Sequence, residues 1–165
     1  MTIIIETGAG LPDAESYASV AAADARCASL GLTAWAALAE PAKEVALRKA
    51  TIHLGSYRTR WAGRRATQAQ ALDWPRYNVV VDDFQVLSTV VPGEIVNACI
   101  DLAARAGAGE DLAPDLKRTV KEKVIGPIKT VYADGAPEHV RFRAVDLLLA
   151  PYLCGSGTSG RLVRG

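Results

Sequence analysis

The chain has 165 residues, 50% of them hydrophobic, and a formal net charge of +1. This length predicts one domain that buries about two-thirds of the surface of its unfolded chain without needing disulfide bonds. A net charge so near zero excludes a globally basic nucleic-acid binder, so any charged surface must be local.

The cysteines and the first residues indicate an intracellular protein. Cys27, Cys99 and Cys154 are odd in number and widely spaced, with no C-x-x-C pair and no histidine at ligand spacing. This pattern predicts neither a disulfide framework nor a zinc site, and it suits a reducing compartment. The apolar run in MTIIIE is too short for a signal peptide or a membrane span. We therefore expect a soluble, non-secreted protein.

The N-terminal region predicts a strand, a loop and a first helix. The β-branched residues 2–6 are typical of a short strand, and the Gly-, Pro- and Ser-containing residues 7–16 are typical of a loop. Ser19 is a suitable N-cap for a helix that Gly31 ends. Cys27 lies on the apolar stripe of this helix, so we interpret it as a small core residue.

A second helix is predicted over residues 42–57, because Pro41 suits a first helical turn. Its apolar residues form two stripes, so we expect it to have neighbours on more than one side. The first stripe contains Leu47, Ala50, Leu54 and Tyr57, and the second contains Val45 and Ile52. His53 lies near the edge of the apolar arc, and without a catalytic partner nearby it is interpreted as a boundary residue.

Residues 58–91 form a connection of unusual length. Its 34 residues exceed the roughly 12 to 15 residues of an ordinary structureless connection, so we expect it to have local structure and a function of its own. Residues 68–72 predict one helical turn. Residues 78–87, which surround Asp82 and Asp83, predict a small hairpin or a pair of extended segments.

The remaining chain predicts a third helix, a pair of strands and a last helix. Pro92 begins the third helix, in which apolar residues recur with clear helical spacing at Ile95, Ala98, Cys99, Leu102 and Ala106. Residues 119–125 and 128–132 predict two strands with alternating lysines. The last helix is predicted from about His139 to near Pro151.

These elements predict a mainly α fold: a bundle of about four helices with a long Arg/Trp-rich connection, a small β-hairpin and a flexible C-terminal tail. We expect residues 1–154 to form a single helical domain and residues 155–165, GSGTSGRLVRG, to form the tail. Its tip is basic and apolar and consists of Arg161, Leu162, Val163 and Arg164. Such a tail is either a disordered terminus or a segment that orders on a partner.

The most unusual composition lies in residues 57–76, YRTRWAGRRATQAQALDWPR, which contain five arginines, two tryptophans and one acid. Two interpretations stay open. The segment could stack bases and neutralise phosphates, as single-strand binders do, or its guanidinium groups could pair with carboxylates of a neighbouring protein. The tryptophans also suit burial as anchors of the loop. The candidate interface residues are Arg58, Arg60, Trp61, Arg64, Arg65, Trp74 and Arg76.

Charge is distributed unevenly along the chain. A second basic stretch, residues 117–129, carries five bases against Glu122, whereas acids gather in Asp82, Asp83, Glu94, Asp101, Glu110 and Asp111. This asymmetry suits contact between copies of the chain or docking on an acidic or phosphate surface, and it is equally typical of solvated faces.

The sequence predicts no enzyme. It contains no G-x-S-x-G, H-E-x-x-H or G-x-x-x-x-G-K-[ST] motif. Its two histidines belong to no catalytic constellation, and its acidic pairs are adjacent in sequence, so their side chains point apart. We therefore expect no catalytic residues, no metal site and no cofactor, and a binding or assembly function instead.

The order of several stretches resembles a known family. These are ETGAGLPDAESYASVAAADA, TAWAAL, RWAGRR followed by QALDWPR, VPGEIVNACIDLAARA, the lysine-bearing strands before VYADG, and AVDLLLAPYL before a glycine-rich tail. Together they are similar to small bacteriophage proteins found among the head-to-tail connector (adaptor) proteins of tailed phages, which often carry the label DnaT-like single-stranded-DNA-binding protein. The resemblance covers nearly the whole chain and brings no catalytic residues with it.

The connector resemblance implies a structural virion protein at the neck between capsid and tail, assembled in the host cytoplasm. Its subunits would form a ring of roughly twelve copies under the portal protein, meet the next tail component and let double-stranded DNA pass, without a membrane partner. The arginine segment would contact a neighbouring subunit or the portal, and Arg161, Leu162, Val163 and Arg164 would dock on the portal. The DnaT-like label implies the alternative function, single-stranded-DNA binding in replication.

Overall fold

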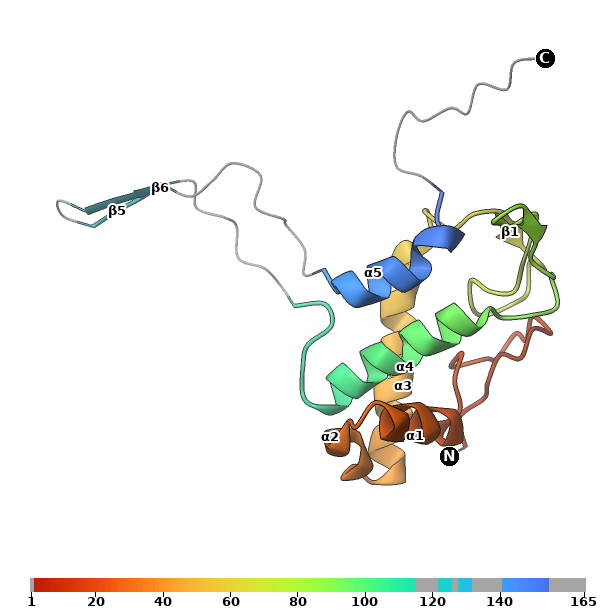
Figure 1. Ribbon diagram of the computed structural model, residues 1–165, viewed down its shortest axis with the longest axis horizontal. Coiled ribbons are helices and arrows are strands. Elements are labelled where there is room, and N and C mark those ends of the chain that lie inside the picture. The colour runs from red at the N-terminus through yellow and green to blue at the C-terminus, as the bar shows by residue number, and fades with distance from the viewer. Residues whose placement is uncertain (1, 115–121, 126–127, 132–140, 155–165) are drawn as a thin grey trace, which may run out of the picture.

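The computed structural model describes residues 2–114, 122–125, 128–131 and 141–154 (Figure 1). The chain is mainly helical, as predicted. The helices are α1 (Val20–Ser29), α2 (Thr33–Ala36), α3 (Glu40–Leu54), α4 (Gly93–Gly107) and α5 (Arg143–Leu149), with 3-10 turns at Gly55–Tyr57 and Ala150–Tyr152. The predicted boundary between a domain and a C-terminal tail stays a prediction, because residues 155–165 lie outside the described residues.

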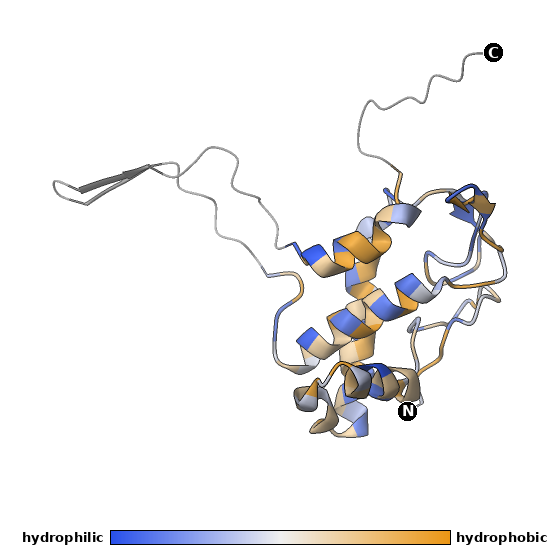
Figure 2. Cartoon of the chain, viewed as in Figure 1, coloured by the Kyte–Doolittle hydropathy of each residue, from blue (hydrophilic) through white to orange (hydrophobic). Residues whose placement is uncertain are grey.

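The core forms where α4 packs between α3 and α5, with α1 and α2 at one end of α3 (Figure 1). Pro92 caps α4, and Ile95, Ala98, Cys99 and Leu102 are buried on its inner face, as the periodicity predicted. Figure 2 shows hydrophobic and hydrophilic residues alternating along α4 and α5. Burial of a large side chain such as Leu102 contributes about 1.5 to 3 kcal/mol to stability, so this packing fixes the helical frame.

Helix α1 begins and ends where the sequence predicted. The Ser19 hydroxyl accepts a hydrogen bond from the Ala22 N–H at 3.0 Å, and Gly31 has a positive φ of 69° just after the helix. Cys27 is buried, which agrees with its interpretation as a core residue. The Arg26 guanidinium donates two hydrogen bonds of 2.9 Å to Asp101, and this bidentate pair ties α1 to α4.

Helix α3 confirms one of its two predicted apolar stripes as core. Its inner stripe is buried at Leu47, Ala50 and Leu54. His53 is half-buried and packs edge-on against Phe142, with 5.3 Å between ring centroids, so it is the boundary residue that the sequence predicted. The second stripe was expected to meet neighbours, but Ile52 is 76% and Val45 is 49% exposed, so within the described residues nothing covers it.

The N-terminal segment differs from the predicted strand. Residues 2–6 make only a single parallel bridge, between Ile5 and Ser16. The buried carboxylate of Glu6 instead accepts hydrogen bonds from the N–H groups of Gly8, Gly10 and Leu11, at 2.7 to 3.0 Å. These contacts fold the following loop back on Glu6, so the segment pairs with residues of its own loop, at Glu15 and Ser16, instead of with a second strand. Helix α2 is a single turn that contains the buried Trp35, and the sequence did not predict it as a helix.

Three short antiparallel strand pairs complete the described chain. They are β1 (Arg64–Arg65) with β2 (Arg76–Tyr77), β3 (Val80–Val81) with β4 (Phe84–Gln85), and β5 (Glu122–Ile125) with β6 (Ile128–Val131). The last two pairs confirm the predicted hairpin at 78–87 and the predicted strand pair. The first pair was not predicted. The helical turn expected at 68–72 is not formed, because these residues belong to the bent loop between β1 and β2.

The last helix begins later than predicted, at Arg143, and its 3-10 turn contains Pro151. His139 and the residues before Arg141 lie outside the described residues. None of the helices in the described part of the chain combines the length and the apolar character needed to cross a membrane.

Candidate functional site

The arginine and tryptophan segment, residues 57–76, folds back on itself. The pairing of β1 with β2 places Arg64 opposite Tyr77 and Arg65 opposite Arg76. The Ala66 N–H continues this ladder by donating to the Pro75 carbonyl at 3.1 Å. The two ends of a long loop are therefore held side by side, which gives the connection the local structure that its length predicted.

The two tryptophans of the segment lie in the core. Trp61 and Trp74 are 3% and 0% exposed, and their rings meet edge to face with 5.9 Å between centroids. Tyr57 and Tyr152 extend this aromatic cluster on either side. Both tryptophans were candidate interface residues, but their burial makes them anchors of the loop and leaves no ring face for a base or a partner.

Arg76 is also buried, and it holds the loop from inside. Its Nε donates to the Ala62 carbonyl at 2.7 Å, and its two terminal nitrogens donate to the carbonyls of Gly63 at 2.9 Å and Asp73 at 3.2 Å. Burial lowers the pKa of Arg76 from its ordinary value. Arg76 was a candidate for the interface, and the structure places its guanidinium inside the loop instead.

Two residues outside the predicted set support the same loop. The Tyr17 hydroxyl accepts hydrogen bonds from the N–H groups of Asp73 at 2.9 Å and Trp74 at 3.2 Å, and burial raises its pKa. The buried Gln70 side chain accepts from the Thr67 N–H and donates to the Leu72 and Pro75 carbonyls. Polar residues gave no periodic signal in the sequence that could have identified these roles.

Arg58 and Arg65 are partly committed to the loop. The Arg58 Nε donates to the buried Asp73 carboxylate at 2.8 Å, while its side chain remains 59% exposed. This carboxylate raises the pKa of Arg58 further, chiefly through the hydrogen bond. Arg65 is half-buried and donates to the Gln70 carbonyl. Both arginines therefore contribute charge to the surface while their positions are fixed by the loop.

Arg60 and Arg64 are the members of the predicted set that face outward and make no ion pair within the described residues. The Arg60 guanidinium lies over the Tyr57 ring, 5.6 Å from its centroid. Arg64 lies directly opposite Tyr77, which is 38% exposed, and directly opposite residues share one face of a strand pair. The loop therefore exposes two guanidinium groups without an ion pair among the described residues and, beside Arg64, one aromatic ring.

We call Arg60, Arg64 and Tyr77 the arginine face. Tyr77 was missed by sequence reasoning because it follows the arginine-rich stretch and comes beside Arg64 only through the pairing of β1 with β2. Alternation of side chains along a strand was the one available signal, and two-residue strands are too short to display it.

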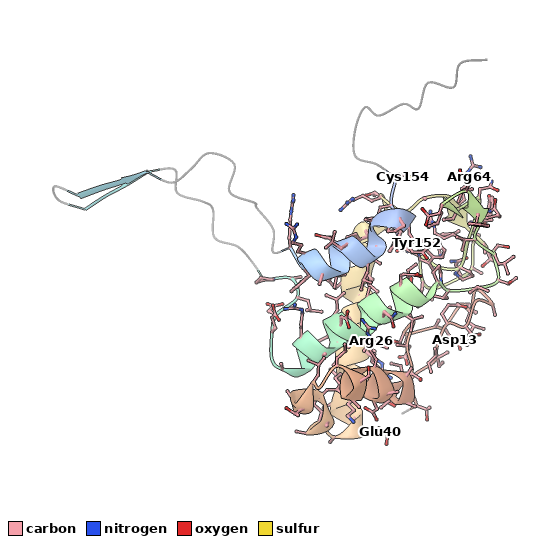
Figure 3. The ribbon with its side chains drawn as sticks, viewed as in Figure 1. Asp13, Arg26, Glu40, Arg64, Tyr152 and Cys154 are labelled. Atoms are coloured by element: carbon pink, nitrogen blue, oxygen red, sulfur yellow. The ribbon has the colours of Figure 1, made fainter. Side chains whose placement is uncertain are left out.

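The described chain ends beside this face. Leu153 forms an antiparallel bridge with Trp61, and the Cys154 N–H donates to the Arg60 carbonyl at 2.6 Å. Figure 3 places Arg64, Tyr152 and Cys154 at one end of the molecule and Glu40 at the other. The candidate docking residues Arg161, Leu162, Val163 and Arg164 lie outside the described residues, which end at Cys154 beside the Arg60 carbonyl.

The described residues contain no cluster suited to a metal ion, and two of their three cysteines are buried. No group of three or more His, Cys, Asp or Glu residues there is placed to hold a metal ion. Cys27 and Cys99 are buried, and burial raises the pKa of each thiol, which suppresses the reactive thiolate.

Comparison with known proteins identifies a family. A family model described as "Putative DnaT-like ssDNA binding protein" matches residues 1–165. No curated protein and no solved structure matches the chain. The family description agrees with the DnaT-like label of the sequence resemblance, names binding rather than a reaction, and does not mention head-to-tail connectors.

The contacts of Arg76 predict a large effect on stability. Replacing Arg76 with Met keeps much of the side chain's volume but leaves three loop carbonyls without their donors. Because each unsatisfied buried acceptor is costly, we expect the Arg76→Met variant to lose about 2 to 5 kcal/mol of unfolding free energy in a urea titration. The matched change Arg64→Met, on the exposed strand, should stay within about 0.5 kcal/mol of the wild type. Equal effects of the two substitutions would contradict the structural role of Arg76.

Proposed function

We propose that this chain, which belongs to the DnaT-like ssDNA-binding protein family, binds single-stranded DNA through its arginine face. The observation that carries the proposal is that Arg64 and Tyr77 share the exposed face of one strand pair, with Arg60 also exposed four residues earlier in the chain. Single-strand binders combine cationic groups for the phosphates with aromatic rings on which bases stack. The arginine face offers both kinds of group.

The side chains of the arginine face suit contact with the phosphate backbone of DNA. Arg60 and Arg64 have guanidinium groups free of carboxylates among the described residues, so phosphate oxygens do not compete with an existing ion pair. The Tyr77 ring offers an apolar surface to any base, since every base has a π face. We therefore expect binding with little sequence preference.

The support beneath the face favours binding by a preformed surface. Arg76, Gln70 and Tyr17 fix the loop through buried hydrogen bonds before any ligand arrives. A preformed loop loses less conformational entropy on binding than a loop that must order. With only two arginines on the arginine face and a net charge of +1, each copy should nevertheless bind DNA modestly, and strongly only at low salt.

Removing the two free arginines should weaken DNA binding in a salt-dependent way. We expect the double variant Arg60→Ala/Arg64→Ala to bind a fluorescein-labelled oligothymidine roughly tenfold more weakly at low salt. The slope of log affinity against log salt should fall by about 1.4 in magnitude, because two phosphate contacts are lost. Fluorescence anisotropy over a salt series measures both quantities. Arg65 is left in place because it donates to the Gln70 carbonyl.

The matched control removes the same charge elsewhere. Arg141→Ala/Arg143→Ala changes two exposed arginines at the start of α5, whereas Arg60 lies near Cys154, beyond the other end of that helix. This control should keep the wild-type salt slope. Equal losses in the two double variants would point to a general charge effect, and an absence of wild-type DNA binding would refute the proposal.

The Tyr77 ring should contribute by stacking. We expect Tyr77→Ala to weaken single-strand binding by about 1 to 3 kcal/mol, the usual value for one stacked base. The salt slope should stay unchanged, because no phosphate contact is removed. Tyr77→Phe keeps the ring and should bind as the wild type does, in the same anisotropy titration. A Tyr77→Ala variant with full affinity would remove the ring from the binding surface.

A second candidate function is the head-to-tail connector that the sequence resemblance implies. Hairpin β3–β4 favours an assembly role, since it exposes Phe84 beside the carboxylates of Asp82 and Asp83. Apolar side chains beside acids suit a protein partner better than a phosphate backbone. In this function the subunits form a ring beneath a portal protein, and the segment containing Arg161 to Arg164 docks on the portal.

Mixing with portal complexes tests the connector candidate. Native mass spectrometry and negative-stain imaging should show a ring of this chain on purified portal complexes, and deletion of residues 155–165 should abolish joining while the domain remains folded. Joining by the truncated chain would contradict the role of the tail. A chain that ignores portal complexes and binds oligothymidine with a steep salt slope would exclude the connector in favour of DNA binding.

A further inference from the structure

Hairpin β3–β4 presents apolar side chains around an acidic turn. Val81 pairs with Phe84, so Asp82 and Asp83 form the two-residue turn, with φ angles of 50° and 66°. Phe84 is 78% exposed, and Leu87, just beyond β4, is 66% exposed. Neither aspartate makes an ion pair within the described residues. A protruding turn with this composition is an unusual surface for an isolated chain.

Helix α3 presents a surface of complementary composition. Val45, Lys49 and Ile52 recur at i, i+4 and i+7, so they lie on one face of the helix, and all three are exposed. We call these residues the α3 stripe. Lys49 makes no ion pair within the described residues. The stripe therefore places one free cation between two apolar side chains, where the hairpin places two free anions beside apolar ones.

The surroundings of Ile52 can receive a side chain. Ile52 borders two hollows, of about 470 Å³ and 520 Å³. The first is lined in part by Leu72 and Arg58, and the second by Lys49 and Leu112. Acids also line both hollows, Glu15 and Asp73 in the first and Glu110 and Asp111 in the second, and Arg58 is already paired with Asp73. Lys49 is therefore the cation beside Ile52 that makes no ion pair within the described residues, and either hollow is large enough for a phenylalanine side chain.

We propose that hairpin β3–β4 of one copy docks on the α3 stripe of a second copy of this chain. Phe84 packs beside Ile52, and the carboxylates of Asp82 and Asp83 pair with Lys49 of the neighbouring copy. The hairpin does not cover its own stripe, because both surfaces are exposed in the same structure. Opposite charges and matched apolar groups on the two surfaces make a second copy the fitting occupant.

The contact joins two different surfaces, so it is heterologous. A heterologous contact leaves one free hairpin and one free stripe on every dimer, and it continues into an open chain or closes into a ring. The residues of this contact are distinct from those of the arginine face. The inference therefore does not depend on DNA binding, and failure of either proposal leaves the other testable.

A mixing experiment separates this contact from other modes of association. We expect the wild-type full chain to form oligomers whose mass rises with concentration in sedimentation velocity and light scattering. Phe84→Ser and Ile52→Ser should each weaken self-association by roughly tenfold or more, as expected for a central apolar contact. Both positions are exposed, so circular dichroism should show an unchanged fold. Leu147→Ser, at a residue that is 64% exposed on α5, is the control and should assemble as the wild type does.

The mixture of the two defective variants gives the decisive result. A Phe84→Ser chain keeps its stripe and an Ile52→Ser chain keeps its hairpin, so an equal mixture should form a one-to-one dimer and nothing larger. Asp82→Asn/Asp83→Asn preserves a turn that tolerates positive φ, and it should weaken assembly and remove its salt dependence. A monomeric wild type, full assembly by either single variant, or an equal mixture that stays monomeric would overturn the proposal.

Discussion

The loop at the centre of the candidate site depends on burying the guanidinium of Arg76, which has no carboxylate partner among the described residues. A buried cation is unfavourable unless its hydrogen bonds are made. Arg76 donates to carbonyls of Ala62, Gly63 and Asp73, which come from both limbs of the loop. These three oxygens converge only when the limbs lie side by side, so the burial of one side chain and the pairing of β1 with β2 require each other.

The same strand pair separates the arginines into two groups. Side chains alternate between the two faces of a strand, and the register places Arg65 with Arg76 and Arg64 with Tyr77. The first pair faces the loop, and the second faces outward. The arginine-rich segment therefore presents only a small cationic surface. A small surface of this kind agrees with the net charge of +1 and suits a binding function that depends on a local patch of charge.

The sequence correctly predicted those features of the fold that depend on residues close together in the chain. The starts of α1, α3 and α4 followed from Ser19, Pro41 and Pro92 to within two residues, because caps and proline act within one turn of a helix.

The structure of the site depended instead on contacts between distant residues. Tyr17 reaches Asp73 from 56 positions away in the chain, and Gln70 organises its loop through polar contacts that carry no hydrophobic pattern. The α3 stripe shows a related limit of prediction from sequence. The sequence identified Ile52 as an apolar residue of the helix, but it did not predict that its side chain would be exposed. Periodicity identifies which residues are apolar and leaves open what covers them.

The closeness of the two proposed surfaces gives them a combined effect. Tyr77 ends β2, Val80 begins β3, and only Asn78 and the buried Val79 lie between them. A contact made by the hairpin therefore fixes the arginine face at a set position relative to the neighbouring copy. Since linked weak sites bind a continuous strand far more tightly than single ones, an assembly of copies would hold single-stranded DNA firmly although the arginine face of each copy offers only two arginines. Assembly and DNA binding would then be linked, because DNA that spans several faces also stabilises the contacts between copies.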